Sequence, residues 1–105
     1  MNFRILPAAD DDANAVEKRL DREQPGFGTD FLVLYRAAVV AIRAAPRQHS
    51  PTEDGPVGIE TRELFIERFN QRVIYAVNET EVVILAVVHA HRRPGSWASR
   101  VEEIG

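Results

Sequence analysis

The spacing of hydrophobic and polar positions divides the chain into a helical first half and an extended last third. Residues 2–6 alternate weakly before Pro7, which cannot donate to a β-ladder, so they predict a short strand. From residue 8 to 24 the apolar positions recur every three or four residues, which predicts an amphipathic helix. The same spacing predicts a second helix over residues 28–45, and Pro46 closes it.

A very short joint, QPGFG, connects the two predicted helices, and it leaves room only for an antiparallel hairpin. The buried faces are expected to carry Ala9, Ala13, Val16 and Leu20 on the first helix, and Phe31, Leu34, Tyr35, Ala38 and Ile42 on the second. Residues 46–59 follow, with three of the six prolines and two of the six glycines, and they predict an exposed loop.

The last third has the pattern of β-structure. Residues 60–68, 71–77 and 81–89 are predicted strands, and tight turns join them into an antiparallel meander. The predicted fold class is therefore α+β: a single domain over residues 1–105, with an N-terminal strand and an antiparallel helical hairpin packed on an antiparallel β-sheet. The order of elements is β-α-α-β-β-β, with a short C-terminal segment.

The strand at 81–89 is apolar on both faces. Strict alternation places Val82, Ile84, Ala86 and Val88 on one face and Val83, Leu85 and Val87 on the other. Such a strand is central and covered on both sides. Because the helical hairpin covers one face only, the other face needs the C-terminal segment, a second subunit or a bound peptide. An uncovered apolar face would mark a partner site.

Composition narrows the chemistry. The 105 residues contain no cysteine, which excludes a disulfide scaffold, a cysteine-ligated metal and a thiol nucleophile. The net charge of −3 argues against a protein whose main task is binding nucleic acid. Twelve of the thirteen basic residues are nevertheless arginine, which binds carboxylate and phosphate through two hydrogen bonds. No secretory signal opens the chain, and the apolar run 82–88 is far short of a membrane span, so a cytoplasmic protein is expected.

One local exception to the acidic balance follows the last strand. Residues 89–100 contain His89, His91, Arg92, Arg93 and Arg100 and no acid. Solvated charges at a strand end are the simplest interpretation. No metal or other cofactor is expected, because the pair His89-x-His91 has no third ligand at a recognisable spacing.

Arg72 opens the middle strand of the meander, and antiparallel pairing brings it near the end of the last strand. Two interpretations stay open. In the first, Arg72 and the basic residues of the segment 89–100 bind a phosphate, with a histidine as proton donor or acceptor. In the second, Arg72 is ion-paired across the sheet with Glu60, Glu63 or Glu67. Trp97 is interpreted as a cap on the core rather than a stacking platform.

The order of elements and the last third together resemble the RelE/ParE superfamily of type II toxin–antitoxin toxins. The matching stretch is FIERFNQRVIYAVNETEVVILAVVHAHRRPGSW. The positions that fit the pattern of the superfamily are Arg68, Phe69, Arg72, Tyr75, Val83, Leu85, Ala86, His89, Arg92, Arg93 and Trp97.

The resemblance implies a toxin that a cognate antitoxin neutralises by direct binding, in a module of the plasmid-stabilisation kind. The RelE-like branch cuts messenger RNA in the ribosome, and Arg72, His91 and Arg93 would be its catalytic residues here. The ParE-like branch poisons DNA gyrase. The acidic charge favours the ParE-like branch. A degenerate, non-toxic binding module is the third hypothesis.

On each hypothesis a partner surface is expected at Arg72, His89, His91, Arg92, Arg93 and Trp97. The expected partners are the antitoxin and, by branch, either DNA gyrase or the ribosome and its mRNA. A hetero-oligomer with the antitoxin and no membrane partner are expected.

Overall fold

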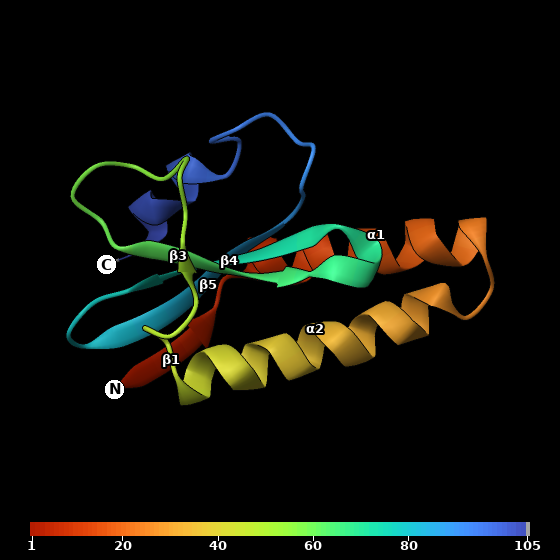
Figure 1. The fold of residues 1–105 in the computed structure, drawn as a ribbon, viewed down its shortest axis with the longest axis horizontal. Coiled ribbons are helices and arrows are strands. Elements are labelled where there is room, and N and C mark those ends of the chain that lie inside the picture. Colours follow the sequence, from red (N-terminus) through yellow and green to blue (C-terminus); the bar gives the residue numbers. More distant parts are fainter. Residues whose placement is uncertain (105) are drawn as a thin grey trace.

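A computed structural model describes residues 1–104 and follows the expected order of elements (Figure 1). Two short 3-10 turns, η1 and η2, accompany the helices and strands. The elements are β1 (Asn2–Ile5), α1 (Pro7–Glu23), α2 (Phe27–Ala44), β2 (Ser50–Pro51), β3 (Thr61–Ile66), η1 (Glu67–Phe69), β4 (Gln71–Val77), β5 (Glu81–His89) and η2 (Ala98–Glu103). None of the helices in this part of the chain has the length and apolar character needed to cross a bilayer.

The two helices match their predicted ranges to within one residue at each end. They form the expected hairpin, in which the carboxylate of Asp21 on α1 accepts the backbone N–H of Gly26 and of Gly28, the latter at 2.8 Å. This side chain thereby satisfies free amides at the start of α2. Gly28 allows the close approach, because a Cβ there would lie 2.5 Å from the carbonyl oxygen of Glu17.

The sheet has the strand order β1-β5-β4-β3-β2. The predicted meander of β3, β4 and β5 is antiparallel, and the α+β fold class is confirmed. β1 adds a parallel edge to it, with Phe3 opposite Val82. The strand predicted over 60–68 is shorter, since β3 ends at Ile66 and η1 leads into Asn70, whose positive φ of 54° makes the turn.

A β-bulge in β5 corrects the expected alternation of faces. Tyr75 of β4 lies opposite Ile84, but Ile74 lies opposite Ala86, so Leu85 is the extra residue. Directly paired side chains share a face. Ile84 and Ala86 are therefore on opposite faces, and the four-residue face predicted from strict alternation is wrong beyond Ile84.

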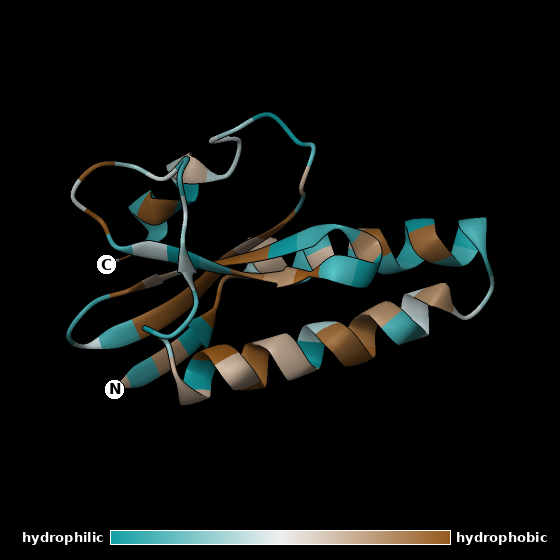
Figure 2. Ribbon diagram, in the orientation of Figure 1, coloured by the Kyte–Doolittle hydropathy of each residue, from teal (hydrophilic) through white to brown (hydrophobic). Residues whose placement is uncertain are grey.

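The second face of the sheet is covered by the chain itself. Trp97 is 1% exposed, and Ala98, Val101 and Ile104 pack against the core. Every residue from Val82 to Val88 is at most 7% exposed. Figure 2 shows this apolar centre in β4 and β5. Of the three possible covers, the C-terminal segment is the one found, and the expectation of a face left bare for a partner is wrong.

Arg100 fastens this cover to the rest of the molecule. Its guanidinium donates to both carboxylate oxygens of Asp12 on α1 and, at 3.0 Å, to the carbonyl oxygen of Leu85. The Asp12 carboxylate also accepts the backbone N–H of Val87. Hydrogen bonding to Asp12 raises the pKa of Arg100. Arg100, one of the basic residues of the segment 89–100, thus has a structural role.

Candidate functional site

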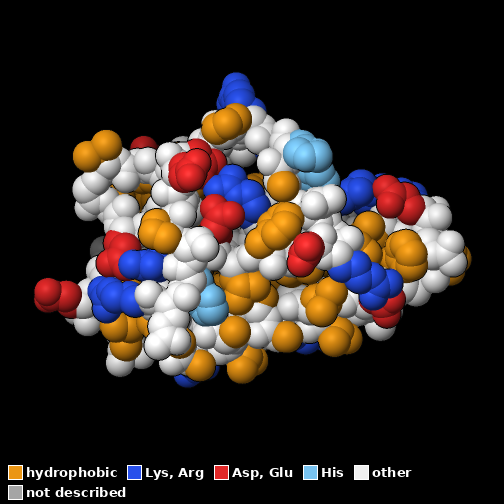
Figure 3. Space-filling model, viewed as in Figure 1, with side chains coloured by type: hydrophobic (Ala, Val, Ile, Leu, Met, Phe, Trp, Pro, Cys, Tyr) orange, Lys and Arg blue, Asp and Glu red, His pale blue; other side chains and the backbone are white. Residues whose placement is uncertain are grey.

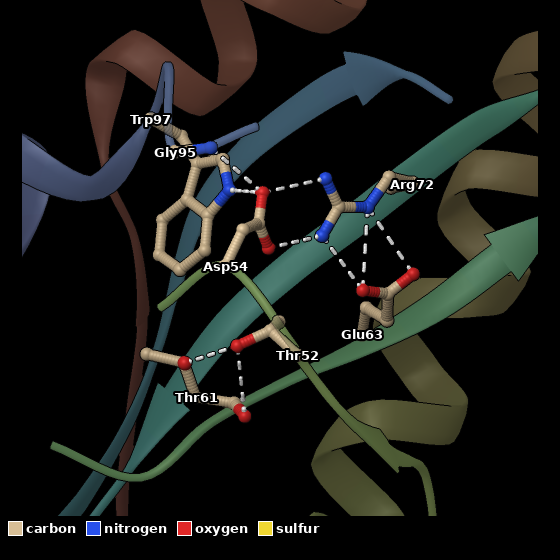
Figure 4. A network of polar contacts seen from close by, with 7 residues as sticks. All are labelled: Thr52, Asp54, Thr61, Glu63, Arg72, Gly95 and Trp97. Carbon is tan, nitrogen blue, oxygen red and sulfur yellow. Dashed lines mark hydrogen bonds and ion pairs between the residues drawn. The ribbon is translucent and has the colours of Figure 1, made fainter. Parts of the chain in front are cut away.

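Arg72 lies at the centre of a polar network on the face covered by the C-terminal segment (Figure 4). Nη1 and Nη2 donate to the two carboxylate oxygens of Asp54 at 3.0 and 2.7 Å. Nε and Nη2 donate to Glu63 at 3.2 and 2.8 Å. Glu63 is one of the three acids expected to pair with Arg72, whereas Asp54 is not among them. The guanidinium is therefore held by two carboxylates at once.

Asp54 reaches Arg72 from the loop between β2 and β3. Its Oδ2 also accepts the backbone N–H of Gly95 at 2.9 Å and the indole N–H of Trp97 at 3.0 Å. One carboxylate therefore joins the predicted exposed loop 46–59 to the C-terminal segment. That loop is not exposed at this point, because the side chain of Asp54 is 11% exposed.

Gly55 fixes the path of the same loop. A Cβ at this residue would lie 2.2 Å from Oγ1 of Thr61 and 3.4 Å from Cη2 of Trp97. The hydroxyls of Thr52 and Thr61 are hydrogen-bonded to each other beneath it. Only glycine leaves room for the loop to run this close to β3 and Trp97, and so to deliver Asp54 to Arg72.

The network has a net charge of −1, from one guanidinium and two carboxylates. Hydrogen bonding to Arg72, helped by Gly95 and Trp97, holds the pKa of Asp54 well below its usual range. Hydrogen bonding to Asp54 in turn raises the pKa of Arg72. A phosphate approaching Arg72 would have to displace a carboxylate that is already bound through two hydrogen bonds.

A hollow of about 640 Å³ opens beside the network. Arg72 and Arg92 both line it, together with the 43% exposed ring of Phe65. The expected approach of Arg72 to the basic segment is therefore found for Arg92. His89 instead pairs with Gln71 across the strands and lies on the opposite face from Arg72.

The basic segment after β5 is otherwise at the surface. His91, Arg92 and Arg93 are exposed and His89 is half-buried, whereas Trp97 lies inside the molecule. Nδ1 of His89 accepts the backbone N–H of His91 at 3.1 Å, which orders the start of the turn. Figure 3 shows histidine side chains beside Lys/Arg side chains in the upper right part of the view. Within residues 1–104, no three potential ligand side chains form a metal site.

Comparisons with known proteins give a likeness of fold. No family model matches this sequence, and the curated proteins give no match either. Among solved structures, a chain of the chromosomal ParDE TA system from P. aeruginosa is similar at a TM-score of 0.63 and 18% sequence identity. The likeness covers 87% of this chain and 97% of that chain. The protein therefore has the fold of a chain from a ParDE toxin–antitoxin system.

Proposed function

We propose that this protein is the toxin of a type II toxin–antitoxin module, that it acts on DNA gyrase in the ParE-like manner, and that a cognate antitoxin neutralises it by binding. The fold supports this proposal, since nearly the whole of a ParDE system chain is matched. The order of elements and the motif in the last third of the sequence point the same way.

The observation that carries the choice of branch is the state of Arg72. A ribonuclease of the RelE-like branch needs its strand arginine available to meet RNA phosphate. Here Arg72 is only 13% exposed and is bound by Asp54 and Glu63. The net charge of −3 also disfavours entry into a site dense in phosphate. Both features support a protein target.

The surface proposed for target and antitoxin contact is the exposed segment with His91, Arg92 and Arg93, together with the half-buried His89. Arg72 and Trp97 support this surface from inside rather than touching a partner. They do so through Asp54, which binds both of them and the backbone of Gly95 at the base of the segment. This division of roles predicts different effects for buried and exposed substitutions.

Controlled expression tests the proposal. The wild-type chain should cause filamentation and DNA-damage signalling, and the purified protein should trap gyrase–DNA cleavage complexes. Co-expression of a short neighbouring gene that encodes the antitoxin should suppress both effects. The double variant Arg92→Glu/Arg93→Glu should lose gyrase trapping while it stays folded. Arg36→Glu/Arg43→Glu, with the same charge change at two exposed positions of α2, is the matched control and should retain trapping.

Two other outcomes would overturn the proposal. An immediate stop of translation that His91→Ala abolishes would assign the chain to the ribonuclease branch. His91 suits this test because it is exposed and its loss leaves the core intact. Stable binding of an antitoxin without any effect on growth, gyrase or translation would identify a degenerate binding module.

A further inference from the structure

Gln71, the first residue of β4, is buried without hydrogen-bond partners. Its side chain is 1% exposed, and within residues 1–104 neither its amide nitrogen nor its amide oxygen has a partner. A buried amide normally finds partners, because leaving it unpaired costs stability. A leucine would fill the same space without that cost. The amide is therefore a candidate contact for something outside the chain.

The surroundings of Gln71 form a hollow of about 350 Å³ between α1 and the end of β5. Gln71 lines it beside His89, its direct partner in the strand register. Ala15, Val16 and Val87 supply apolar lining. A second hollow of about 390 Å³ adjoins the first, since Arg19 and His89 line both. The size and the mixture of apolar lining with a few polar groups are typical of a small-molecule site.

The rim of the first hollow is basic. Arg19 and Arg22 from α1 and Arg92 after β5 line it. Among residues 1–104, Asp12 is the one acidic residue in its lining, and Arg100 already neutralises it. Arg19 pairs with Glu23 at the surface, but Arg22 and Arg92 form no ion pair within residues 1–104. A protein of charge −3 thus concentrates positive charge around an unpaired buried amide.

We propose that this hollow binds the phosphate groups of a nucleotide at Arg19, Arg22 and Arg92, and that the Gln71 amide contacts the edge of its base. Arginine binds phosphate oxygens through two hydrogen bonds, and a glutamine amide offers the donor and acceptor pair that a base edge matches. Because the amide atoms of Gln71 are buried, the proposal requires the half-buried side chain of His89, its partner in the strand register, to move aside when the base binds. Free nucleotide and single-stranded nucleic acid share this chemistry.

This site is separate from the Arg72 network, because Gln71 and Arg72 are successive residues of a strand and face opposite sides of the sheet. It shares His89 and Arg92 with the surface proposed for the target and the antitoxin, but binding and toxicity are measured by different experiments. A protein that arrests growth but binds no phosphate probe would overturn this inference and leave the proposed function standing. A protein that binds nucleotide but affects neither gyrase nor translation would overturn the proposed function and leave this inference standing.

Calorimetric titration of the purified full chain tests the site. The probes are ADP, inorganic phosphate, a single-stranded oligonucleotide of about twelve residues, and poly-glutamate, each at low and at raised salt. We expect ADP to bind more tightly than inorganic phosphate. Tighter binding of the oligonucleotide that weakens steeply with salt would identify nucleic acid as the source of the phosphate, and equal or weaker binding would identify a free nucleotide.

Substitutions locate the binding. Arg22→Gln should weaken ADP binding about tenfold through loss of a charged partner. Gln71→Leu should weaken it by a similar factor, with Gln71→Met as a second apolar variant. Arg36→Gln removes the same charge from α2, where the residue lines a different hollow, and should bind as the wild type.

Four results would contradict the proposal. They are no heat from any phosphate probe at millimolar concentration, binding of poly-glutamate as tight as that of ADP, equal weakening by Arg36→Gln, or unchanged ADP binding by both Gln71 variants. The second of these would point instead to an acidic protein partner.

Discussion

Gln71 and Arg72 are neighbours on β4, and the structure treats their polar groups in opposite ways. Arg72 donates to two carboxylates on one face of the sheet. Gln71, on the other face, keeps both amide atoms unpaired within residues 1–104 although it is more deeply buried. The two neighbours therefore show two outcomes for a polar side chain in a core. The paired Arg72 holds parts of the fold together, whereas the unpaired Gln71 costs stability.

The contrast changes how the motif in the sequence is interpreted. Arg72 belongs to the matched pattern, yet its partners Asp54 and Trp97 make it a structural clasp between the loop, the sheet and the C-terminal segment. Gln71 is not a matched position in that pattern, yet it faces the basic hollow. A polar group whose hydrogen bonds are all made inside the chain has few donors or acceptors left for a ligand. An unpaired polar group keeps its donors and acceptors available.

Removing the guanidinium breaks the paired side of the comparison and has the largest expected effect. Arg72→Leu leaves Asp54 and Glu63 close together without a counter-charge, and should lower the free energy of unfolding by about 3–5 kcal/mol. Urea denaturation at neutral pH measures it. Arg93→Leu, at an exposed position, is the control and should stay within about 0.5 kcal/mol of the wild type. A loss below about 1 kcal/mol for Arg72→Leu would mean that the clasp is not a buried ion pair.

Neutralising Asp54 tests the same clasp through pH. Asp54→Asn should lower the free energy of unfolding by about 1–3 kcal/mol at neutral pH. Because the pKa of Asp54 is lowered in the folded state, its contribution is complete above the unfolded pKa of about 3.9 and is lost as pH falls toward the folded value. The gap between wild type and variant should therefore narrow below about pH 4. Unfolding curves from neutral to acid pH measure this gap, and a constant gap would contradict it.

The unpaired side should respond with the opposite sign. Gln71→Leu removes an amide without hydrogen bonds and keeps a similar volume, so the free energy of unfolding should rise by about 1 kcal/mol. Thermal and urea denaturation without added ligand give this number. A decrease would show that the Gln71 amide is satisfied in solution, for example by a bound water.

The smallest effect is expected at the rim of the basic hollow. Arg22→Gln alters an exposed side chain that forms no ion pair within the described residues, so stability should change by less than about 0.5 kcal/mol. The comparison is sharpened if this variant loses phosphate binding at unchanged stability. A large loss of stability from Arg22→Gln would make the rim part of the structural frame.

Elements with a strong period could be predicted from sequence, and contacts between distant loops could not. The ranges of β4 and β5 match their predictions because both strands are runs of apolar residues between polar turns. The α1 and α2 ranges follow from apolar stripes in the same way. The Leu85 bulge left no signal, since a bulge depends on how the neighbouring strand pairs.

The candidate site was predicted only in part. Glu63 was among three possible partners of Arg72, and the strand register selected it. Asp54 lies in a loop whose composition predicts only exposure, and it meets Arg72 and Trp97 from 18 and 43 residues away in sequence. The isolation of Gln71 is a property of three-dimensional packing and has no pattern along the chain. Composition and spacing cannot report such encounters.

Contacts between early and late residues of the sequence bear on how the molecule folds. β1 pairs with β5, Arg4 donates to the carbonyl oxygen of Glu103, and Arg100 binds Asp12. Contacts between residues so distant in sequence close large loops and slow folding. During translation, β1 and α1 can therefore form these contacts only after residues 81–103 have been synthesised. A prematurely terminated chain would leave the apolar centre of its sheet open to aggregation and degradation.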